Sequence, residues 1–261
     1  MKSKTSAGSA ENTIHFEAVE YRLNGSGNRA IVTEIGFSVA AGQTLVLLGR
    51  SGSGKTTLLR LINRLLVPTT GRVVVRGRST CDWDPIQLRR GIGYVIQDAG
   101  LFPHFTVAEN IALVPSLEKW DAARTGARVD ELLVLVGLEP AQYRSRRPRE
   151  LSGGQRQRVG VARALAADPP ILLMDEPFGA LDPVTRAELQ HEFGALARRL
   201  GKTIVFVTHD LREALLLASR IILLEKGRIV ADATPQEFPN VDHLEVRAFT
   251  ASLTPLPGGH A

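Results

Sequence analysis

Apolar residues along the chain follow two different periods, and the changes between them predict the elements. Residues 14–19 alternate between apolar and polar side chains, as in a half-buried β-strand. Residues 56–66 carry apolar side chains at helical spacing, which predicts a helix. Short apolar runs predict further strands at 44–48, 73–75, 93–96, 171–175, 203–208 and 221–224. Strands that alternate with helices in this way indicate a parallel α/β sheet.

The pattern changes over about 98–168, where helical segments replace the strands. One of these segments, 130–136, is followed by Gly137, a residue type that is common just past the end of a helix. We therefore expect a mostly helical insertion inside one domain that spans 13–240. The sequence contains no internal repeat and no long linker.

The composition is that of an ordinary soluble globular protein, with 44% hydrophobic and 23% charged residues. The N-terminal stretch 1–12 lacks the apolar segment of a secretory signal and is expected to be a disordered tail, and 241–261 is expected to be a loose tail. No apolar run approaches the ~20 residues that cross a bilayer, so a role at a membrane would be peripheral. The single cysteine, Cys81, excludes an internal disulfide framework and suits a reducing compartment.

The net charge of +5 raises the question of a nucleic acid or an anionic membrane as partner. The sequence contains none of the usual nucleic-acid-binding modules, so we interpret the charge as a solvated basic surface and expect no nucleic-acid partner. The densest group of arginines is Arg144, Arg146, Arg147 and Arg149. Contact with lipid headgroups or with a partner subunit is the alternative interpretation of this group.

A glycine-rich loop between the strand 44–48 and the helix 56–66 has the spacing of a phosphate-binding loop. Its glycines allow a tight turn in which backbone N–H groups point at phosphate oxygens, and the helix N-terminus adds partial positive charge. Lys55 is expected to bind the β- and γ-phosphates of a nucleotide, and Thr56 to bind Mg²⁺. The predicted nucleotide-binding residues of this loop are Gly49, Arg50, Ser51, Gly52, Ser53, Gly54, Lys55, Thr56 and Thr57.

Two more motifs follow along the chain. A helix is expected to begin at Ser152-Gly153-Gly154-Gln155, where the serine is the usual N-cap and the glycines and the helix dipole also make a second anion site. The strand 171–175 ends in Asp175, which Glu176 follows. An aspartate at the end of such a strand is placed to bind the Mg²⁺ that bridges nucleotide phosphates.

Together, these motifs and their order resemble the ATP-binding-cassette ATPases, whose signature Leu-Ser-Gly-Gly-Gln stands at 151–155. The resemblance extends from about Ile14 to about Phe238. It implies an α/β fold: a RecA-like P-loop core with an N-terminal antiparallel β subdomain and an inserted helical subdomain. It also implies ATP and Mg²⁺ as cofactors. The signature of one subunit would face the phosphate loop of the other in a head-to-tail dimer, formed by two copies or by paralogous ATPases.

The resemblance also assigns roles to single residues. Glu176 stands where the family places the general base that polarises the attacking water. His209 matches the switch histidine that contacts the γ-phosphate, and Asp182 matches the loop that crosses the dimer interface. Gln97 matches the glutamine that joins the helical subdomain and reaches Mg²⁺ and the attacking water. With Lys55 of the phosphate loop, these residues form the expected catalytic set.

The residue that stacks on adenine is a departure from the family pattern. Counting from the first strand, the usual aromatic position falls on Leu23, and Tyr21 lies two residues earlier. Either Tyr21 takes this role or adenine packs on aliphatic surface.

Three stretches, 61–65, 93–104 and 178–186, are similar to the ATPase subunits of bacterial importers of glycine betaine, choline, carnitine or proline. This likeness implies transmembrane permease subunits, indirectly a substrate-binding protein, and a peripheral place on the cytoplasmic face of the inner or plasma membrane. Many members of this branch carry a C-terminal pair of cystathionine-β-synthase-type domains, which this sequence is too short to hold. The apolar group 101–105 is expected to dock the permease, with core packing as the alternative.

Other functions compete with this interpretation. An importer of another small solute would use the same motifs, whereas a soluble cassette ATPase of DNA repair or ribosome function usually has long coiled-coil insertions or two cassettes. A P-loop kinase or GTPase would lack the signature and a histidine placed like His209. A module that only binds ATP would be expected to lack Lys55 or Glu176, and both are present.

Overall fold

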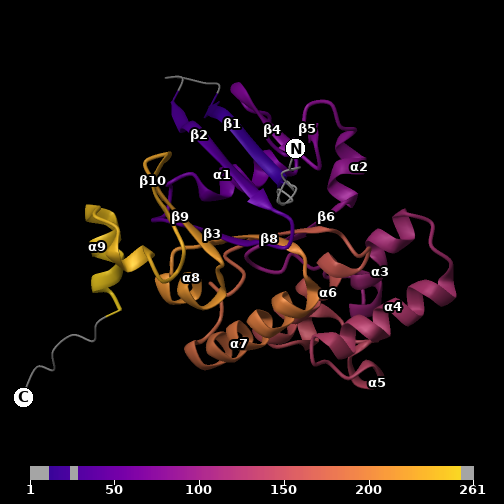
Figure 1. Cartoon of the computed structure of the whole chain (residues 1–261). Coiled ribbons are helices and arrows are strands. Elements are labelled where there is room, and N and C mark those ends of the chain that lie inside the picture. Colours follow the sequence, from indigo (N-terminus) through magenta and orange to yellow (C-terminus); the bar gives the residue numbers. More distant parts are fainter. Residues whose placement is uncertain (1–11, 24–28, 254–261) are drawn as a thin grey trace, which may run out of the picture.

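The computed structural model describes residues 12–23 and 29–253 of the chain. Its strands form two sheets, of which the N-terminal one lies above the other in Figure 1. The N-terminal sheet is antiparallel and has the order β2-β1-β4-β5. Its strands are β1 (Asn12–Arg22), β2 (Ala30–Ala40), β4 (Thr70–Val75) and β5 (Arg78–Ser79).

The second sheet forms the centre of the molecule and has the order β10-β9-β3-β8-β7-β6. Its strands run parallel except β10, which pairs antiparallel with β9. They are β3 (Thr44–Leu48), β6 (Ile92–Val95), β7 (Ile171–Asp175), β8 (Thr203–Thr208), β9 (Arg220–Glu225) and β10 (Arg228–Ala233). The predicted fold class is confirmed: a parallel P-loop core, an antiparallel N-terminal sheet and a helical insertion between β6 and β7.

The register of the central sheet decides which loops meet. Leu48 at the end of β3 lies opposite Thr208 of β8, and Asp175 at the end of β7 lies opposite Val207. The loops that follow these three neighbouring strands therefore leave the sheet at one edge. Open parallel sheets bind their ligands at such an edge, outside the carboxyl ends of the strands.

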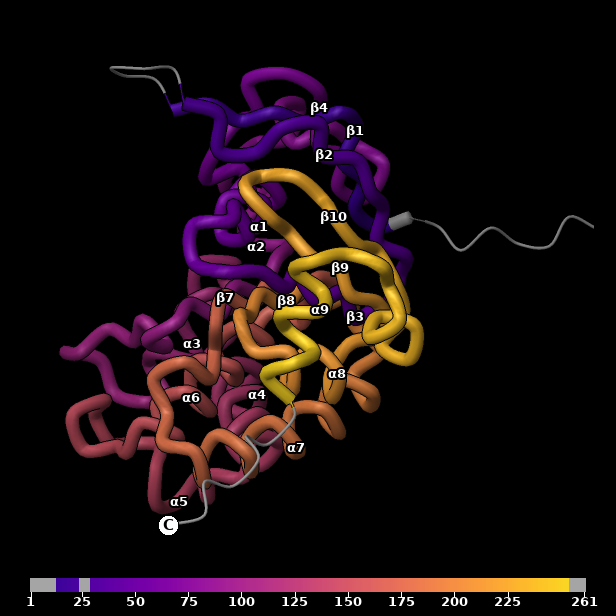
Figure 2. Tube along the Cα trace, turned by 90° about the vertical axis from the view of Figure 1, so that its left-hand side faces the viewer, coloured from indigo at the N-terminus to yellow at the C-terminus, as the bar shows by residue number. Residues whose placement is uncertain are grey.

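The helices cover both faces of the central sheet (Figure 1). They are α1 (Lys55–Ile62), α2 (Pro85–Arg90), α3 (Val107–Leu117), α4 (Ala122–Leu135), α5 (Pro140–Tyr143), α6 (Gly153–Leu165), α7 (Pro183–Leu200), α8 (Leu211–Leu217) and α9 (Leu244–Ala251). Two short 3₁₀ turns, η1 (Pro148–Glu150) and η2 (Phe238–Asn240), precede α6 and α9. Figures 1 and 2 show α9 next to the edge of the sheet that β9 and β10 form.

Burial on both faces explains why the central strands have no polar alternation. Along β3, Leu45 and Leu47 face a core shared with α1 and the N-terminal sheet. Val46 and Leu48 face a second core, which α3, α4, α6, α7 and α8 complete on the other side. Successive side chains point to opposite faces of a strand, so a strand buried on both faces is a continuous apolar run.

The predicted strands at 171–175 and 203–208 agree with β7 and β8 to the residue, but the helix predicted over 56–66 is too long. Helix α1 ends at Ile62 because Arg64 adopts a left-handed conformation, with φ 55°. The Asn63 side chain then accepts a hydrogen bond from the Leu65 backbone N–H at 3.1 Å. Leu65 fits the apolar spacing of the predicted helix, but it lies outside α1 and its side chain is 49% exposed.

The segment 241–253, expected within a loose tail, is folded instead. It contains α9, whose Val246 is fully buried and whose Phe249 packs on the helical core. The rest of that predicted tail, 254–261, and residues 1–11 lie outside the described residues. No helix within 12–23 and 29–253 has both the length and the apolar character of a membrane span.

Candidate active site

The loop after β3 turns tightly into α1. Gly54, which precedes the helix, has φ 105°, a conformation that side chains disfavour. A Cβ at Gly54 would lie 2.6 Å from Val32 Cγ1, and one at Gly49 would lie 2.5 Å from the Leu224 carbonyl oxygen. Only glycine fits these two positions, so the loop approaches its neighbours more closely than a loop with side chains could.

Lys55 is the first residue of α1, and its side chain folds back over the loop. Its Nζ donates hydrogen bonds to the carbonyl oxygens of Gly49 at 2.7 Å and Arg50 at 2.9 Å. Burial lowers the pKa of Lys55, while Glu176 and Asp175 act in the opposite direction. A buried ammonium beside a glycine-rich loop is the arrangement that a phosphate group needs.

Thr56 and Asp175 come from different elements and meet at the sheet edge. Thr56 Oγ1 donates to Asp175 Oδ1 at 2.9 Å, and the Tyr94 hydroxyl donates to Asp175 Oδ2 at 3.4 Å. Burial raises the pKa of Asp175, and the hydrogen bond from Thr56 partly opposes this. Burial, with the nearby Asp175 charge, also raises the pKa of Tyr94 to about 12. Burial destabilises the ionised form of this carboxylate, and a cation beside it would stabilise that form.

The donors at this point fit Mg²⁺. Thr56 and Asp175 offer two hard oxygen ligands, and Mg²⁺ in nucleotide sites uses one or two protein oxygens, waters and the phosphates. Within the described residues no group of three or more His, Cys, Asp or Glu side chains could hold a metal. The pair therefore suits a metal that arrives with a phosphate ligand better than one held by protein alone.

Glu176 and His209 form a second pair next to the first. Glu176 follows β7 with φ 45°, an uncommon conformation for a residue with a side chain, and its backbone N–H donates to the Val207 carbonyl at 3.0 Å. Its Oε2 lies 3.0 Å from His209 Nδ1. A carboxylate next to a histidine can take a proton from water while the histidine orients it.

Gln97 is exposed just after β6, and its amide points toward the same place. A Cβ built on Gly179 would lie 3.6 Å from Gln97 Nε2 and 3.8 Å from Glu176 Oε2. Both side chains therefore reach the space over Gly179. The structure brings together Lys55, Thr56, Gln97, Asp175, Glu176 and His209 of the predicted set.

Helix α9 also lines this site, which the sequence interpretation missed. A cavity of about 610 Å³ lies between Arg50, Ser51, Glu176 and His209 on one side and Ala248, Phe249 and Ser252 on the other. Arg50 Nε lies 2.9 Å from Glu245 Oε2, which ties the phosphate loop to α9. The apolar pair Val246 and Phe249 at helical spacing was the available signal of a packed helix.

The signature residues form a closed helix cap. Ser152 Oγ accepts from the Gln155 backbone N–H at 3.3 Å, and Gln155 Oε1 accepts from the Ser152 N–H at 2.9 Å. Gln155 Nε2 also donates to the Tyr143 hydroxyl at 3.0 Å. Ser152 is exposed, whereas Gly154 is buried, and a Cβ on Gly154 would lie 2.7 Å from Thr185 Cγ2. Helix α6 therefore presents an exposed, capped N-terminus.

The structure does not bring this cap to the phosphate loop. Helix α1 packs on the face of the central sheet that the N-terminal sheet covers, and α6 packs on the opposite face. Gly153 instead borders a cavity of about 290 Å³ with Gln97, Asp98, Ala180 and Leu181. Among the residues that the structure describes, no hydrogen bond or ion pair joins 151–155 to 49–57.

Asp182 and Tyr21 lie apart from these clusters. Asp182 is the exposed N-cap of α7, and its carboxylate accepts from the Thr185 N–H at 3.1 Å. That hydrogen bonding lowers the pKa of Asp182. Tyr21 pairs with Val32 across β1 and β2 and is half-buried against the N-terminal core, whereas Leu23 is 51% exposed. Contact of Asp182 with a second subunit and of Tyr21 with adenine stay predictions.

Comparison with known families matches residues 32–179 to the ABC transporter model. The chain is 54% identical over 211 residues to a glycine betaine/carnitine/choline transport ATP-binding protein of Bacillus subtilis, covering 81% of this chain and 55% of the relative. It is 52% identical over 209 residues to a glycine betaine uptake system ATP-binding protein of Escherichia coli, covering 80% of this chain and 68% of the relative. The chain thus spans about half to two thirds of the curated relatives that it matches.

Two solved structures share the fold. A dimeric ATP-binding cassette in a post-hydrolysis state with ADP and inorganic phosphate superposes with a TM-score of 0.76 and 33% identity, over 85% of this chain and 98% of that chain. A subunit of a Clostridium perfringens ABC transporter complex superposes with a TM-score of 0.78 and 28% identity, over 87% of this chain and 90% of that chain.

Proposed function

The chain belongs to the ABC transporter family, and from that premise we propose that it is the ATP-hydrolysing subunit of a bacterial importer of an osmoprotectant. One observation carries this proposal. The Lys55 loop, the Thr56–Asp175 pair and the Glu176–His209 pair converge at the carboxyl edge of the central sheet. Binding of nucleotide phosphates and activation of a water require these groups within reach of one another.

In this proposal the loop binds the phosphates of ATP. Its backbone N–H groups and the N-terminus of α1 surround the phosphates, and Lys55 exchanges its contacts with the Gly49 and Arg50 carbonyls for phosphate oxygens. Thr56 and Asp175 would hold Mg²⁺, which neutralises charge on the phosphates when it is bound. Tyr94 and Thr56 orient Asp175 through the two hydrogen bonds to its carboxylate.

Hydrolysis then depends on Glu176. With His209 donating from Nδ1 to Glu176 Oε2, the second carboxylate oxygen is left to accept the proton of an attacking water. The left-handed backbone at Glu176 directs the side chain away from the strand, toward the cavity that Arg50 and Ser51 also line. Gln97, over Gly179, is near enough to orient the same water.

The exposed cap at Ser152 supports a two-chain site. A capped helix N-terminus with two glycines suits an anion, and this one faces away from the phosphate loop of its own chain. Two copies arranged head to tail would place Ser152 of one against the nucleotide on Lys55 of the other. Asp182, exposed at the start of α7, would lie in the same interface.

A membrane permease is the proposed partner at the helical side. Phe102 is 42% exposed and Phe105 is half-buried, with their ring centroids 5.3 Å apart. Phe102 also borders a cavity of about 320 Å³ with Tyr94, Ile96, Leu113 and Val114. An apolar surface of this kind suits a short amphipathic helix of a membrane subunit, which would hold the chain at the cytoplasmic face of the membrane.

The substrate is proposed from the relatives alone, because no residue of the ATP site would contact a transported solute. Their printed names include glycine betaine, carnitine and choline. We therefore expect a small quaternary ammonium compound, or proline, delivered by a binding protein. An ATPase serving another importer of small solutes would keep every residue assigned above and differ only in its partners.

The test combines uptake with hydrolysis. Cells that lack this chain should lose uptake of labelled glycine betaine, choline or proline, and the wild-type chain should restore it whereas Lys55→Ala should not. If uptake of these compounds is unchanged and uptake of another solute is lost, the osmoprotectant assignment is wrong. If the purified chain fails to hydrolyse ATP with Mg²⁺ both alone and with its permease, the ATPase assignment itself is wrong.

A further inference from the structure

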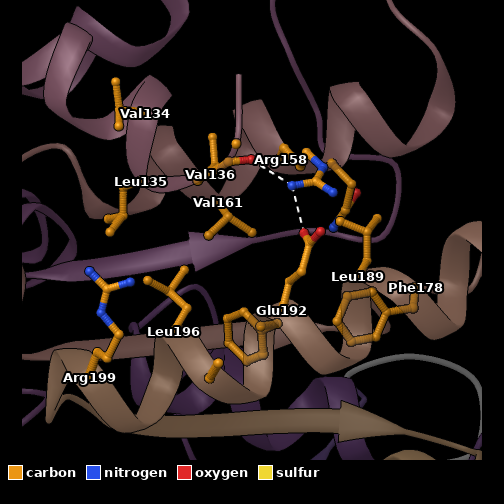
Figure 3. Close-up of a pocket in the computed structure, with 14 residues that line it drawn as sticks. Val134, Leu135, Val136, Arg158, Val161, Phe178, Leu189, Glu192, Leu196 and Arg199 are labelled. Atoms are coloured by element: carbon orange, nitrogen blue, oxygen red, sulfur yellow. Dashed lines mark hydrogen bonds and ion pairs between the residues drawn. The ribbon is translucent and has the colours of Figure 1, made fainter. Parts of the chain in front are cut away.

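A separate cavity lies between α7, the end of α4 and the middle of α6, away from the phosphate loop (Figure 3). Its volume is about 320 Å³, within the range of small-ligand sites. Its walls are mainly apolar and include Val136, Val161, Phe178, Leu189, Phe193 and Leu196. None of the catalytic groups identified above for ATP lines this cavity, so the proposed function does not use it.

One arginine holds the three helices around the cavity in place. Arg158 Nη1 donates to the Val136 carbonyl oxygen at 2.7 Å and lies 2.6 Å from Glu192 Oε2, as the dashed lines in Figure 3 show. A Cβ on Gly137 would lie 2.9 Å from Arg158 Nη1, so glycine leaves room for this contact. The end of α4, the middle of α6 and the middle of α7 are thereby joined, and the cavity between them is a built feature.

Gln157, next to that arginine, has an unused donor. Its side chain is only 4% exposed and lines the cavity, and Nε2 has no hydrogen-bond partner among the described residues. Buried amide N–H groups without an acceptor are rare, because each gives up its bonds to water. An acceptor atom inside the cavity would complete this group.

Arg199 provides a cation at the other end. It lines the cavity from the last turn of α7, and its guanidinium makes no hydrogen bond or ion pair with the residues that the structure describes. Figure 3 shows Arg199 beside Leu196, at the opposite end of the cavity from Phe178 and Leu189. The nearest acidic side chain on this wall, Glu192, is already paired with Arg158.

The separation of the two polar ends follows from helix geometry. A Cβ on Gly154 would lie 3.5 Å from Leu189 Cδ1, and Arg158 pairs with Glu192, so Gln157 lies near the turn 189–192 of α7. Arg199 lies seven residues beyond Glu192, which is about 10 Å along the helix at 1.5 Å per residue. A ligand that met both ends would be extended.

We propose that this cavity is a binding site for an extended amphipathic anion, a medium-chain carboxylate with a hydrogen-bond acceptor at its far end. The carboxylate pairs with Arg199, the apolar chain packs between α6 and α7, and the far acceptor takes the Gln157 amide proton. Gln157 also borders the neighbouring cavity with Gln97, Gly153 and Leu181. Occupation would therefore fix the Gln157 side chain between α6 and Gln97 and change ATP turnover, a consequence that rests on the proposed function.

The ligand test measures the binding of three molecules to the purified full chain. All three have an eight-carbon chain and differ in their end groups. Isothermal calorimetry should show binding of 8-hydroxyoctanoate and about 2–10-fold weaker binding of octanoate, which lacks the far acceptor. The cation 8-amino-1-octanol should not bind, because its charge meets Arg199. Absence of binding by 8-hydroxyoctanoate, or equal binding of all three, would overturn the proposal.

Variants locate the ligand. Ala195→Trp should fill the cavity and abolish binding, and Arg199→Gln should weaken it about 2–5-fold, the worth of an exposed ion pair. Arg198→Gln, which changes the adjacent exposed arginine outside the cavity, is the matched control and should bind as the wild type does. Gln157→Leu should remove the difference between 8-hydroxyoctanoate and octanoate. If Ala195→Trp does not fold, Arg199→Gln and Arg198→Gln still test the position of the ligand. Equal weakening of ligand binding by these two variants would place the ligand outside the cavity.

Turnover is measured separately from binding. Saturating 8-hydroxyoctanoate should change ATP hydrolysis by the wild type at least about twofold and leave Ala195→Trp unaffected, since its cavity is filled. Binding without any effect on turnover would remove the regulatory part and keep the site. An inactive chain that still binds the ligand would contradict the proposed function and leave the site supported.

Discussion

The phosphate loop and the signature end of α6 are both helix N-termini at which we propose that an anion binds, but their surroundings in the chain differ. Around the loop, Lys55 is buried, Thr56 is bonded to Asp175, and the pair Glu176–His209 is in place. At the signature, Ser152 is exposed and its cap bonds close only on its own helix. One region is assembled from the start of α1 and the ends of the three neighbouring strands β3, β7 and β8, whereas the other is a single helix end.

From this difference we infer separate roles for the two regions. In the proposed function, the first region binds a Mg²⁺-nucleotide and activates water with groups of one chain. The second makes no hydrogen bond or ion pair with the groups of the first among the described residues and lies on the other face of the central sheet, so in the proposed function it acts on a nucleotide presented by another chain. The central claim that follows is that a complete ATP site needs Ser152 from a second copy.

The largest expected effect comes from the first region. Glu176→Gln keeps the shape of the side chain and its contact with His209 but removes the base, so ATP turnover should fall about 10²–10⁴-fold. ATP binding, measured by calorimetry, should stay within about twofold of the wild type, since the base contributes to the transition state and not to ground-state binding. Glu188→Gln, on the exposed side of α7, is the control. Equal turnover of the two variants would mean that Glu176 is not the base.

A change in the second region should give a different signature. Ser152→Arg places a bulky cation at the exposed cap, where it should block the γ-phosphate side of a partner's site. Turnover should fall about tenfold or more, while the affinity of the monomeric chain for ATP should not change. Lys55→Ala should do the reverse and weaken ATP binding itself. If Ser152→Arg weakens ATP binding by the monomer as much as Lys55→Ala does, the two regions serve one chain's nucleotide.

Replacement of Asp175 should raise the stability of the fold and lower the ATPase activity. Burial raises the pKa of folded Asp175 above its unfolded value, so the ionised form costs folding free energy at neutral pH. That cost disappears as the pH falls through the folded pKa. Asp175→Asn should therefore raise the melting temperature without Mg²⁺, and lower Mg²⁺-dependent turnover about 10²-fold or more, since the metal supplies several kcal/mol. A lower melting temperature without Mg²⁺ would contradict the burial argument.

Asp182 should show the smallest effect and the opposite sign. Hydrogen bonding to Thr185 lowers the pKa of Asp182, so its contribution to stability is present above the unfolded pKa and is lost as the pH falls through the folded value. Asp182→Asn should flatten the fall in melting temperature below about pH 4, where carboxylates of ordinary pKa protonate. The group is exposed, so the change should be slight. An Asp182→Asn profile identical to the wild-type profile would mean that the cap bond is not held in solution.

The positions of the first region's residues could be predicted from sequence because a tight turn and neighbouring strands fix them locally. The spacing of Gly49, Gly54 and Lys55 is set by a tight turn, and Asp175 is placed by the pairing of β7 with β8. The predicted positions of these residues on strands and helix starts agree with the structure. Their roles in binding and catalysis stay predictions that the variants above test.

The parts that sequence did not predict depend on distant contacts. Arg50 and Glu245 are separated by 195 positions, and nothing local in either segment indicates that they pair. The hydrogen bond from Tyr94 to Asp175 depends on β6 and β7 lying side by side. The early end of α1 came from Asn63 and Arg64, whose local conformation overrode the apolar spacing that continued to Leu65.

The most direct test of the central claim is a crosslink between two chains. Cys81 is exposed, so it is first replaced by serine, and Ser51→Cys and Ser152→Cys are then placed on differently tagged chains that also carry Glu176→Gln. The mixture is oxidised with and without Mg²⁺-ATP and resolved by non-reducing electrophoresis. The account predicts a disulfide-linked dimer carrying both tags, formed with ATP and absent when either chain is oxidised alone. A chain carrying both cysteines that closes an internal disulfide, with no mixed dimer from the single variants, would contradict it.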